Sequence, residues 1–519
     1  MPVATVLVSL HSLSAPGYLI QVDDVFGPHA PAIAWGFSAP IELIDNLLGG
    51  AVAGRLWVAG ALFLCGFGPM VFLRDRHWTA QVFAGILAAL NPWVFGRLVE
   101  GQWGVAAAVG VAFLWLGPWE DLLRRPRAGA ALKSAGLAWA AVTFDQHSIV
   151  ILIALAVASW LGRAGWRNGS SLAWGVASFA VVGLVLTYGW VPFFLGHNLA
   201  SYATVRGFTT ADLSLFRATG SPVYGLWMNL LGLFGFWPER LGRIPLLNQG
   251  APWWPVTTLF LTAAAVTGAY LRRDRAWLLP LGVLGVLAAG STATGPGLAV
   301  ASWAMRTVPL LGAFREPEKW AALWLIALVV LGAETLTVLA HHALGPGSRR
   351  SALAGVGLAC VCLSAVVPSG VRALREYPVT VQPVTYPATW LRTARFIRDH
   401  VASSSEIVIL PWQLYEPLAF AGRRLTENPA RAVFPGTLLS PTDAQVGGSQ
   451  TATGPQGIGY ASLNARPGSC ALSRSLSRLN ASWALVEPTL HGAADQRELV
   501  ACGWHVAFKR PGGPAVLQR

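Results

Sequence analysis

Charged residues are scarce in this 519-residue chain. Only 12% of its residues are Asp, Glu, Lys or Arg, whereas 54% are apolar and the mean hydropathy is +0.51. A soluble domain carries about 25% charged residues, so this chain has too little polar surface to cover a soluble fold. The scarcity of charge therefore indicates an integral membrane protein.

The signatures of common soluble enzymes are also missing. The sequence has no P-loop, no Rossmann glycine fingerprint, no HExxH and no GxSxG, which argues against a soluble nucleotide-using enzyme. Its five cysteines show no CxxC or Cys/His ligand spacing, which argues against a structural zinc site. The net charge of +13 is interpreted as arginines that fix membrane topology, and no nucleic-acid partner is expected.

Apolar stretches follow one another along the first 369 residues. Residues 3–13 are too short to cross about 30 Å of hydrocarbon, which needs about 20 residues, and we interpret them as a first transmembrane helix that is truncated at its start. Further spans are predicted at 54–73, 79–97, 103–119, 128–144, 147–162, 171–194, 252–271, 277–291, 318–340 and 351–368. The sequence thus predicts a mainly α, polytopic bundle of about eleven transmembrane helices.

Arginines occupy alternate loops between these spans. They are Arg74 and Arg76; Arg124, Arg125 and Arg127; Arg163 and Arg167; Arg272, Arg273 and Arg275; and Arg349 and Arg350. Cytoplasmic loops carry the excess of Lys and Arg, so this side is assigned to the cytoplasm. The interpretation places the N-terminus in the cytoplasm and the C-terminal region outside the cytoplasmic (inner) membrane.

The region from 370 to 519 is more polar and alternates helices with strands. Helices are predicted at 389–401 and 493–500, and strands at 406–410, 482–488 and 504–509. This alternation predicts a small extracytoplasmic α/β domain after the bundle of residues 1–369. The stretch 435–467 is rich in Gly, Ser, Thr and Pro and is predicted to be a loop.

Two cysteines, Cys470 and Cys502, lie in this C-terminal region. An extracytoplasmic space allows disulfides to form and persist, and the elements beside the two cysteines can be neighbours in a small sheet. We therefore predict a disulfide between them. The alternative is a pair of unpaired, buried thiols.

Polar residues gather in the turns on the predicted outer side. An acidic pair, Asp23 and Asp24, follows the first apolar segment, and Glu100, Gln102, Asp145 and His147 lie in two tight turns. Arg315, Glu316 and Lys319 open the span at 318–340. Each residue taken singly fits a helix cap or a solvated turn. Together they lie on one face of a membrane bundle, which is typical of a functional site.

The long outer loop, residues 195–251, carries Arg206 and further arginines against the positive-inside bias. They are either simple surface residues, because long loops translocate regardless of charge, or ligands for a lipid phosphate. The aromatic segment 223–237 of this loop is predicted to be an interfacial helix in the outer leaflet.

Three segments of the sequence carry a resemblance to a known family. YLIQVDDVFGPHAP, NPWVFGRLVEGQW and FREPEKW look like segments of large actinobacterial and archaeal membrane proteins of the GT-C superfamily of polytopic glycosyltransferases. The resemblance covers the whole bundle. Members of this superfamily transfer a sugar from a polyprenyl-phosphate donor outside the cytoplasmic membrane.

The resemblance implies roles for individual residues. Asp23 matches the catalytic carboxylate of the first outer loop, with Asp24 second. A second carboxylate beside the first either raises the pKa of one of them or binds a divalent cation such as Mg or Mn. The expected substrate-binding residues are His29, Glu100, Gln102, Asp145, His147, Arg206, Arg315, Glu316 and Lys319.

Two classes of function follow. The first is a membrane glycosyltransferase whose partners are membrane lipids, a polyprenyl-phosphate-linked sugar and a cell-envelope glycan or glycolipid acceptor. The second is a non-catalytic transporter or assembly scaffold for envelope lipids or polysaccharides. A transporter tends to show internal repeats and charges near the membrane midplane. No clear repeat occurs here and the charges fall at the ends of the spans, which favours the enzyme.

Overall fold

The computed structural model describes residues 50–163, 169–187, 210–240, 251–308, 315–344, 386–413, 415–422, 425–439 and 470–519, with isolated positions between these ranges. The chain forms two compact units, of which the first contains Trp57–Val191 and Leu213–Thr380 and the second contains Val381–Arg519. The predicted division of the chain after residue 369 stays a prediction.

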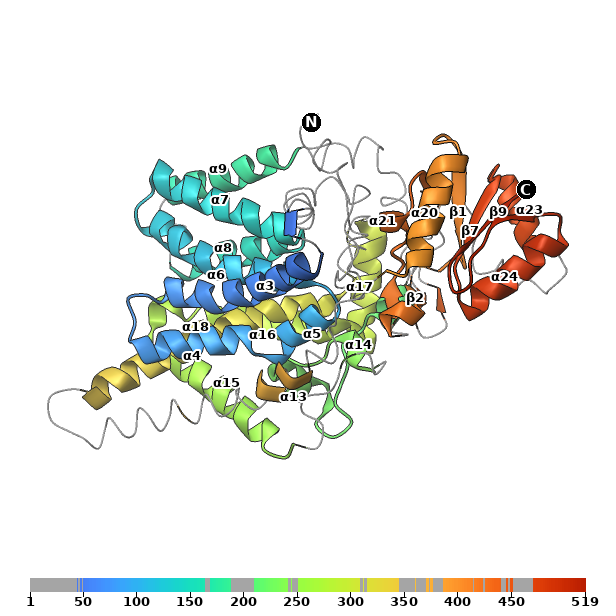
Figure 1. The fold of residues 1–519 in the computed structure, drawn as a ribbon. Coiled ribbons are helices and arrows are strands. Elements are labelled where there is room, and N and C mark those ends of the chain that lie inside the picture. Colours follow the sequence, from blue (N-terminus) through green and yellow to red (C-terminus); the bar gives the residue numbers. More distant parts are fainter. Residues whose placement is uncertain are drawn as a thin grey trace. The chain divides into compact units, whose positions relative to one another are not determined.

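The first unit, which we call the bundle, consists of helices (Figure 1). In chain order they are α3 (Gly50–Phe72), α4 (Trp78–Ala89), α5 (Pro92–Val99), α6 (Trp103–Arg124), α7 (Ala128–Phe144), α8 (Ser148–Gly162), α9 (Gly169–Val185), α12 (Thr210–Leu215), α13 (Gly225–Leu231), α14 (Trp237–Arg240), α15 (Trp254–Leu271), α16 (Leu278–Gly290), α17 (Gly295–Thr307) and α18 (Ala321–Leu344). Short 3-10 turns, η3 (Arg273–Arg275), η4 (Ser291–Ala293) and η6 (Pro317–Trp320), adjoin α15, α16 and α18.

Six helical stretches among the described residues are long and apolar enough to cross a membrane. They are Gly54–Phe72, Trp78–Val99, Trp103–Arg124, Trp254–Leu271, Arg273–Ala293 and Pro317–His341. These stretches coincide with six of the predicted spans, and α8 and α9 are shorter apolar helices at two more. The protein is therefore a multi-pass membrane protein. The predicted spans at 3–13 and 351–368 lie outside the described residues apart from Cys360, so the total of about eleven stays a prediction.

Helix α18 forms the centre of the bundle. Its apolar window is 89% buried, and it packs against α4, α15 and α16. Glycine allows the helices to approach closely, because a Cβ on Gly268 of α15 would overlap the carbonyl oxygen of Leu331 on α18. A Cβ on Gly110 of α6 would likewise overlap the backbone of Leu64 on α3. Small residues at such contacts allow the close van der Waals packing that stabilises membrane helix bundles.

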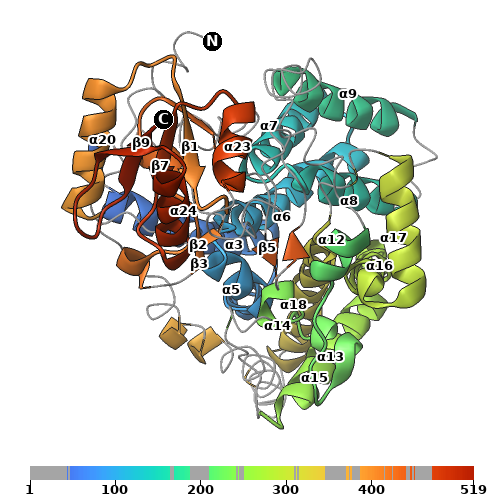
Figure 2. The same ribbon diagram turned by 90° about the vertical axis from the view of Figure 1, so that its right-hand side faces the viewer.

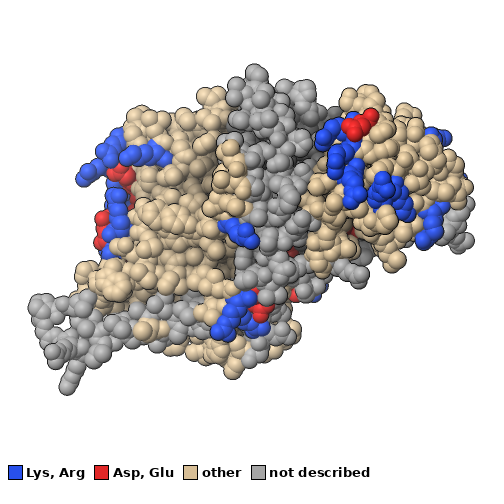
Figure 3. Space-filling model, in the orientation of Figure 1, with Lys and Arg blue, Asp and Glu red and all other residues tan. Residues whose placement is uncertain are grey.

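Two buried glutamates hold arginines from several loops at one end of the bundle, which we call the arginine end. The ion pairs join Glu120 to Arg124, Arg163 and Arg275, and Glu334 to Arg76, Arg272 and Arg275. Figure 3 shows Lys, Arg, Asp and Glu side chains gathered at that end beside an uncharged flank. Four of the five arginine-bearing loops thus lie at the same end, as the alternation in the sequence predicts.

The prediction of an interfacial helix over 223–237 is wrong for most of the segment. In the first half of the segment, α13 is helical and ends at Leu231. Leu233 and Gly235 then take positive φ values of 66° and 105°, so the helix does not continue through the second half. Phe234 and Phe236 are buried in the bundle, whereas Trp227 remains 43% exposed. A single helix in the membrane interface would bury only the aromatic rings on one of its faces. By turning into the bundle, the segment buries Phe234 and Phe236 as well.

The second unit contains a five-stranded sheet in the order β4-β1-β7-β9-β8. Its strands are β1 (Glu406–Leu410), β4 (Thr437–Leu439), β7 (Trp483–Val486), β8 (His505–Phe508) and β9 (Ala515–Gln518). Strands β4, β1 and β7 are parallel, and β9 and β8 continue the sheet antiparallel. Two short antiparallel pairs, β2 (Tyr415–Pro417) with β3 (Leu425–Glu427) and β5 (Gln445–Val446) with β6 (Ser449–Gln450), lie outside it.

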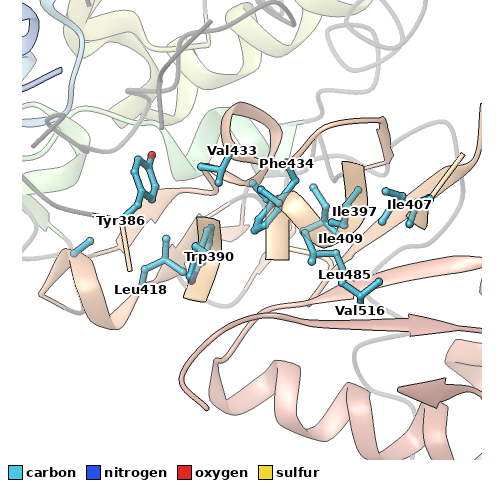
Figure 4. Packing of buried hydrophobic residues seen from close by; sticks show 14 residues of the cluster. Tyr386, Trp390, Ile397, Ile407, Ile409, Leu418, Val433, Phe434, Leu485 and Val516 are labelled. Atoms are coloured by element: carbon cyan, nitrogen blue, oxygen red, sulfur yellow. The ribbon is translucent and has the colours of Figure 1, made fainter. Parts of the chain in front are cut away.

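Helices cover both faces of this sheet (Figures 1 and 2). On one face, Trp390 and Ile397 of α20 (Ala388–His400) pack with Ile407 and Ile409 of β1, as Figure 4 shows. On the other face, the side chains of Val408 and Leu410 pack with residues of α23 (Ala471–Arg478) and α24 (Leu490–Ala501). Alternate residues of β1 enter opposite cores, which explains why its sequence, EIVIL, is a continuous apolar run.

Most of the predicted elements of this domain are present, and the structure adds others. The predicted helices at 389–401 and 493–500 correspond to α20 and α24, and the predicted strands to β1, β7 and β8. The stretch 435–467 is not loop throughout, because Thr437–Leu439 forms the edge strand β4 beside β1. This segment is short and flanked by Gly and Pro, so its own sequence does not predict a strand. It becomes a strand because its backbone forms hydrogen bonds with β1.

Cys470 and Cys502 form a disulfide with a Cα–Cα distance of 5.7 Å. Cys470 precedes α23 and Cys502 follows α24, so the bond joins the start of one helix to the end of the other. The two helices also pack against each other. The bond therefore links the two helices that cover one face of the sheet.

The position of the arginine-bearing loops predicts the topology of the chain. A reporter fused after Arg125 or Arg273 should be cytoplasmic, and a reporter fused after residue 400 should be outside, because Lys and Arg accumulate on the cytoplasmic side. Paired phosphatase and fluorescent-protein fusions measure this directly. A cytoplasmic reporter after residue 400 would contradict the eleven-span arrangement.

Loss of the disulfide should destabilise the C-terminal domain. The bond closes a separation of 32 residues, and its removal in Cys470→Ala/Cys502→Ala should cost about 3 to 4 kcal/mol in the chain-entropy description. Hydrogen exchange of peptides from α23, α24 and β7 measures the free energy of opening. Cys360→Ala, which removes an exposed free thiol, is the control and should leave exchange unchanged; equal protection in all three proteins would refute the prediction.

Candidate functional site

The turns that join α5 to α6 and α7 to α8 meet the start of α18 through polar side chains. We call Arg97, Gln102, Asp145, His147, Glu316 and Lys319 the polar network. Helix α6 separates this network from the arginine end, since Gln102 precedes its first residue and Glu120 lies in its last two turns. At 1.5 Å per residue its 22 residues extend about 33 Å. The two clusters therefore lie at opposite ends of the bundle.

Arg97 and Glu316 form the buried part of the network. The Arg97 side chain is fully buried, and its Nη1 lies 3.2 Å from Oε2 of Glu316. Gln102 bridges the two, because its Oε1 accepts from Nη1 of Arg97 and its Nε2 donates to Oε2 of Glu316 at 3.2 Å. The guanidinium stacks on the ring of Phe236, with Cζ 3.8 Å from the ring centroid. Glu316 is thus held from two sides.

Lys319, His147 and Asp145 form the less buried part. The Lys319 Nζ lies 3.7 Å from Oε2 of Glu316 and 3.1 Å from Nδ1 of His147. The same Nδ1 lies 2.8 Å from Oδ1 of Asp145. A single ring nitrogen cannot donate to Asp145 and accept from Lys319 at once. The shorter contact to an anionic oxygen favours an Nδ1–H that donates to Asp145.

Both carboxylates of the network are held in the charged form. Burial alone would raise the pKa of Glu316, but Lys319 and Arg97 outweigh it and lower that pKa to about 2. Burial opposes the shift of Asp145 in the same way, and the charges of His147 and Lys319 bring its pKa below the ordinary value. Near neutral pH the network therefore keeps two fixed negative charges that position cationic side chains.

A third carboxyl group lies close to Arg97 in the bundle. Glu239 of α14 is buried and accepts from the backbone N–H of Gly235 at 3.0 Å. Burial raises the pKa of Glu239 to about 8, although this hydrogen bond and the charge of Arg97 oppose the shift. Glu239 is therefore mostly protonated at neutral pH, and Glu316 is the charged partner of Arg97.

The remaining predicted site residues lie near the network or outside the described residues. Glu100 is buried at the end of α5. Arg315 stacks on Phe216 at 5.0 Å, and its charge helps to lower the pKa of Glu316. The expected catalytic and substrate-binding residues Asp23, Asp24, His29 and Arg206 lie outside the described residues.

Arg97, a member of the network, and Glu239, which lies close to Arg97, are not among the site residues that the sequence predicts. Arg97 stands in an otherwise apolar helix, PWVFGRLV, and a charge in such a segment indicates a bundle-facing partner. The sequence therefore indicates that Arg97 has a partner inside the bundle. It does not indicate which residue that partner is, because Glu316 lies 219 residues further along the chain.

An apolar cavity of about 280 Å³ adjoins the polar network. Its wall includes Pro317 and Trp320, which belong to the 3-10 turn that carries Lys319, and Val150 in the first turn of α8, just after His147. Ala288 of α16 and Ala301 of α17 complete the wall. The turn Pro317–Trp320 thus carries Lys319 of the network and also contributes two residues to the wall of the cavity. Such an arrangement suits a ligand with a charged head and an apolar chain.

Among the described residues, no group of three or more His, Cys, Asp and Glu side chains could hold a metal ion. The predicted divalent-cation ligands, Asp23 and Asp24, are not among them.

No protein-family model and no curated protein matches this sequence. Solved structures do. The arabinofuranosyltransferase AftD from Mycobacteria is 16% identical, with a TM-score of 0.62 over 100% of this chain, and its R1389S mutant, class 2, is 17% identical, with a TM-score of 0.57 over 94%. This chain covers only 39% and 36% of the length of those AftD chains.

Two weaker similarities were also found. The oligosaccharyltransferase AglB from Archaeoglobus fulgidus is 12% identical with a TM-score of 0.40, and it covers 99% of this chain and 69% of its own length. ArnT from Cupriavidus metallidurans is 13% identical with a TM-score of 0.41, over 94% of this chain and 87% of its own. AftD, AglB and ArnT are GT-C membrane glycosyltransferases. The similarity to AftD, at 16% identity, shows that this chain and the matched part of AftD share a fold.

Proposed function

We propose that this chain is a membrane glycosyltransferase that transfers a sugar from a polyprenyl-phosphate donor to a cell-envelope glycan or glycolipid. The observation that carries the proposal is the turn Pro317–Trp320, which holds Lys319 of the polar network and also lines an apolar cavity. A polyprenyl phosphate combines an anionic head with a long apolar chain, so both halves of the donor find a matching surface. The GT-C fold shared with AftD supports the same reaction class.

Lys319 and His147 are the groups that would meet the donor phosphate. Lys319 has three donors and makes contacts to Glu316 and His147, and its side chain is 13% exposed. The Arg97–Gln102–Glu316 part lies behind it and fixes its position. Charge stabilisation of the departing phosphate by such preorganised donors is the main way in which this chemistry is accelerated.

The transfer itself needs a base at the acceptor. The bond between the anomeric carbon and the phosphate oxygen breaks, and the acceptor oxygen forms a new bond to that carbon. Asp23 takes the proton of the acceptor hydroxyl, as the family resemblance implies, and Asp24 assists it through a shared proton or a divalent cation. The polyprenyl phosphate leaves with its own negative charge, so no nucleotide is required.

The location of the reaction follows from the topology. The arginine end is assigned to the cytoplasm by the positive-inside rule, and the polar network then faces the outer side of the inner membrane. A disulfide in the C-terminal domain suits an extracytoplasmic position for that domain. Donor, acceptor and network would therefore meet outside the cytoplasm.

Removal of the Lys319 charge should weaken binding of the donor head. Polyprenyl monophosphate, the product common to all donors of this class, is a suitable ligand because it does not depend on the sugar. Lys319→Gln should bind it at least 10-fold more weakly than the wild type and should lower transfer by about 10²-fold to 10³-fold. Titration followed by the thermal shift of the detergent-solubilised protein measures the affinity.

Two further variants complete this experiment. Lys319→Arg keeps the charge and should recover most of the affinity, and Arg306→Gln, which removes an exposed cation of α17, should leave it unchanged. Equal affinity of Lys319→Gln and the wild type would show that the network does not bind the phosphate.

Replacement of the proposed base should separate binding from transfer. Asp23→Asn should lower the rate of transfer by about 10²-fold to 10⁴-fold while polyprenyl monophosphate binding is retained. Sugar transfer from a panel of polyprenyl-phosphoryl sugars to envelope lipids measures the rate. Asp399→Asn in the C-terminal domain is the matched control. Full transfer by Asp23→Asn/Asp24→Asn would leave a transporter or scaffold as the better interpretation of the bundle.

A further inference from the structure

The arginine end contains a cavity of about 780 Å³. Five cationic side chains line it: Arg74, Arg124, Arg127, Lys133 and Arg275. Three acidic side chains, Asp75, Glu120 and Asp121, line it as well. The walls of the cavity therefore carry a surplus of positive charge. The polar network is at the other end of the bundle, so the proposed transfer does not use this cavity.

At the arginine end the buried carboxylates are fewer than the arginines that pair with them, and the more exposed Asp75, Asp121 and Asp274 pair with Arg74, Arg127 and Arg272. Glu120 and Glu334 are the two buried carboxylates, and they face five arginines: Arg76, Arg124, Arg163, Arg272 and Arg275. The least exposed lining cation is Arg275, which is 6% exposed. Its Nε is buried without a hydrogen-bond acceptor among the described residues. A cation with an unused donor beside a cavity favours an anion there, because a buried donor without a partner is costly.

The first turn of α7 adds to the positive potential. Gly129 and Ala130 line the cavity, and α7 is a helix of 17 residues that begins at Ala128. The first turn of a helix carries the positive end of the helix dipole, although the N–H of Ala130 is bonded to the carbonyl oxygen of Arg127. Arg127 immediately before α7 is 2.6 Å from Asp121 through its Nη2, which holds it at the rim.

Apolar residues form the rest of the wall. Val71 and Phe72 of α3, Leu114 of α6 and Leu137 of α7 line the cavity together with the charged groups. All three helices extend from the arginine end into the apolar part of the bundle, and two of them are membrane-crossing stretches. A ligand with its anionic group at the helix ends and an apolar chain along these residues would match both parts of the wall.

We propose that this cavity binds a phosphate group, and that the arginine end is a second anion site of the protein. A phosphate offers several oxygens to the forked donors of arginine. The group can belong to the headgroup of an anionic phospholipid, whose acyl chain would lie along Leu114 and Leu137, or to soluble phosphate. The proposal is independent of the proposed transferase activity.

The test compares two ligands on the full-length protein in a neutral detergent. One arm adds phosphatidylglycerol in mixed micelles and the other adds sodium phosphate. Native mass spectrometry counts bound molecules, and the thermal shift gives the affinity. The test variant is Arg127→Gln/Lys133→Gln. Lys133→Glu is a second variant, because Lys133 is exposed and its replacement leaves the helix packing intact.

Two controls accompany these variants. Arg125→Gln removes an exposed cation in the same loop that does not line the cavity. Arg306→Gln removes an exposed cation of α17 that does not line the cavity. Both should bind the ligand like the wild type, whereas the two test variants should bind it at least 10-fold more weakly.

The outcomes separate the sources of the phosphate. Binding of phosphatidylglycerol alone assigns the cavity to a lipid headgroup, and binding of sodium phosphate as well shows that the phosphate group suffices. Absence of binding in both arms for the wild type overturns the proposal. It is also overturned when the test variants bind either ligand as tightly as Arg125→Gln does.

Discussion

Neutralisation of charge inside an apolar bundle is the constraint on which this structure depends. Hydrocarbon provides no water for a charged side chain, so each arginine or carboxylate that enters the bundle needs a partner within hydrogen-bond reach. Arg97 illustrates the result, because it is fully buried and pairs with Glu316 while it stacks on Phe236. That single pair ties the end of α5 to the start of α18, and α18 is the central helix of the bundle.

The same constraint gives the two ends of the bundle different chemistry. At one end, fixed carboxylates position Lys319 and His147, and the turn that carries Lys319 also lines an apolar cavity. At the other end, two buried carboxylates are outnumbered by the arginines around them, and a larger cavity there is lined by a surplus of cations. An excess of anchored cations can bind an anionic group at either end. The first end also carries an aspartate–histidine contact that orients the imidazole ring.

The second unit depends on burial of apolar side chains, since helices cover both faces of its sheet. Side chains of β1 alternate between the core under α20 and the core under α23 and α24. The disulfide joins the ends of α23 and α24 and so holds one of these layers together. The bond joins residues 32 positions apart and so restricts the unfolded chain, which stabilises the folded domain.

The sequence by itself determined that this chain is a multi-pass membrane protein, which loops share an end, and which turns carry polar groups, because these properties follow from runs of apolar residues and from the alternation of neighbouring helices. It also predicted β1, β7, α20 and the pairing of Cys470 with Cys502. Only the tertiary structure decided that Arg97 joins Gln102 and Glu316, that Phe236 lies beneath the guanidinium, and that Thr437–Leu439 is a strand. Each of these depends on a partner distant in the sequence. A local sequence pattern indicates whether a residue is buried or exposed. The residue with which a buried polar group pairs depends on how the helices and strands pack.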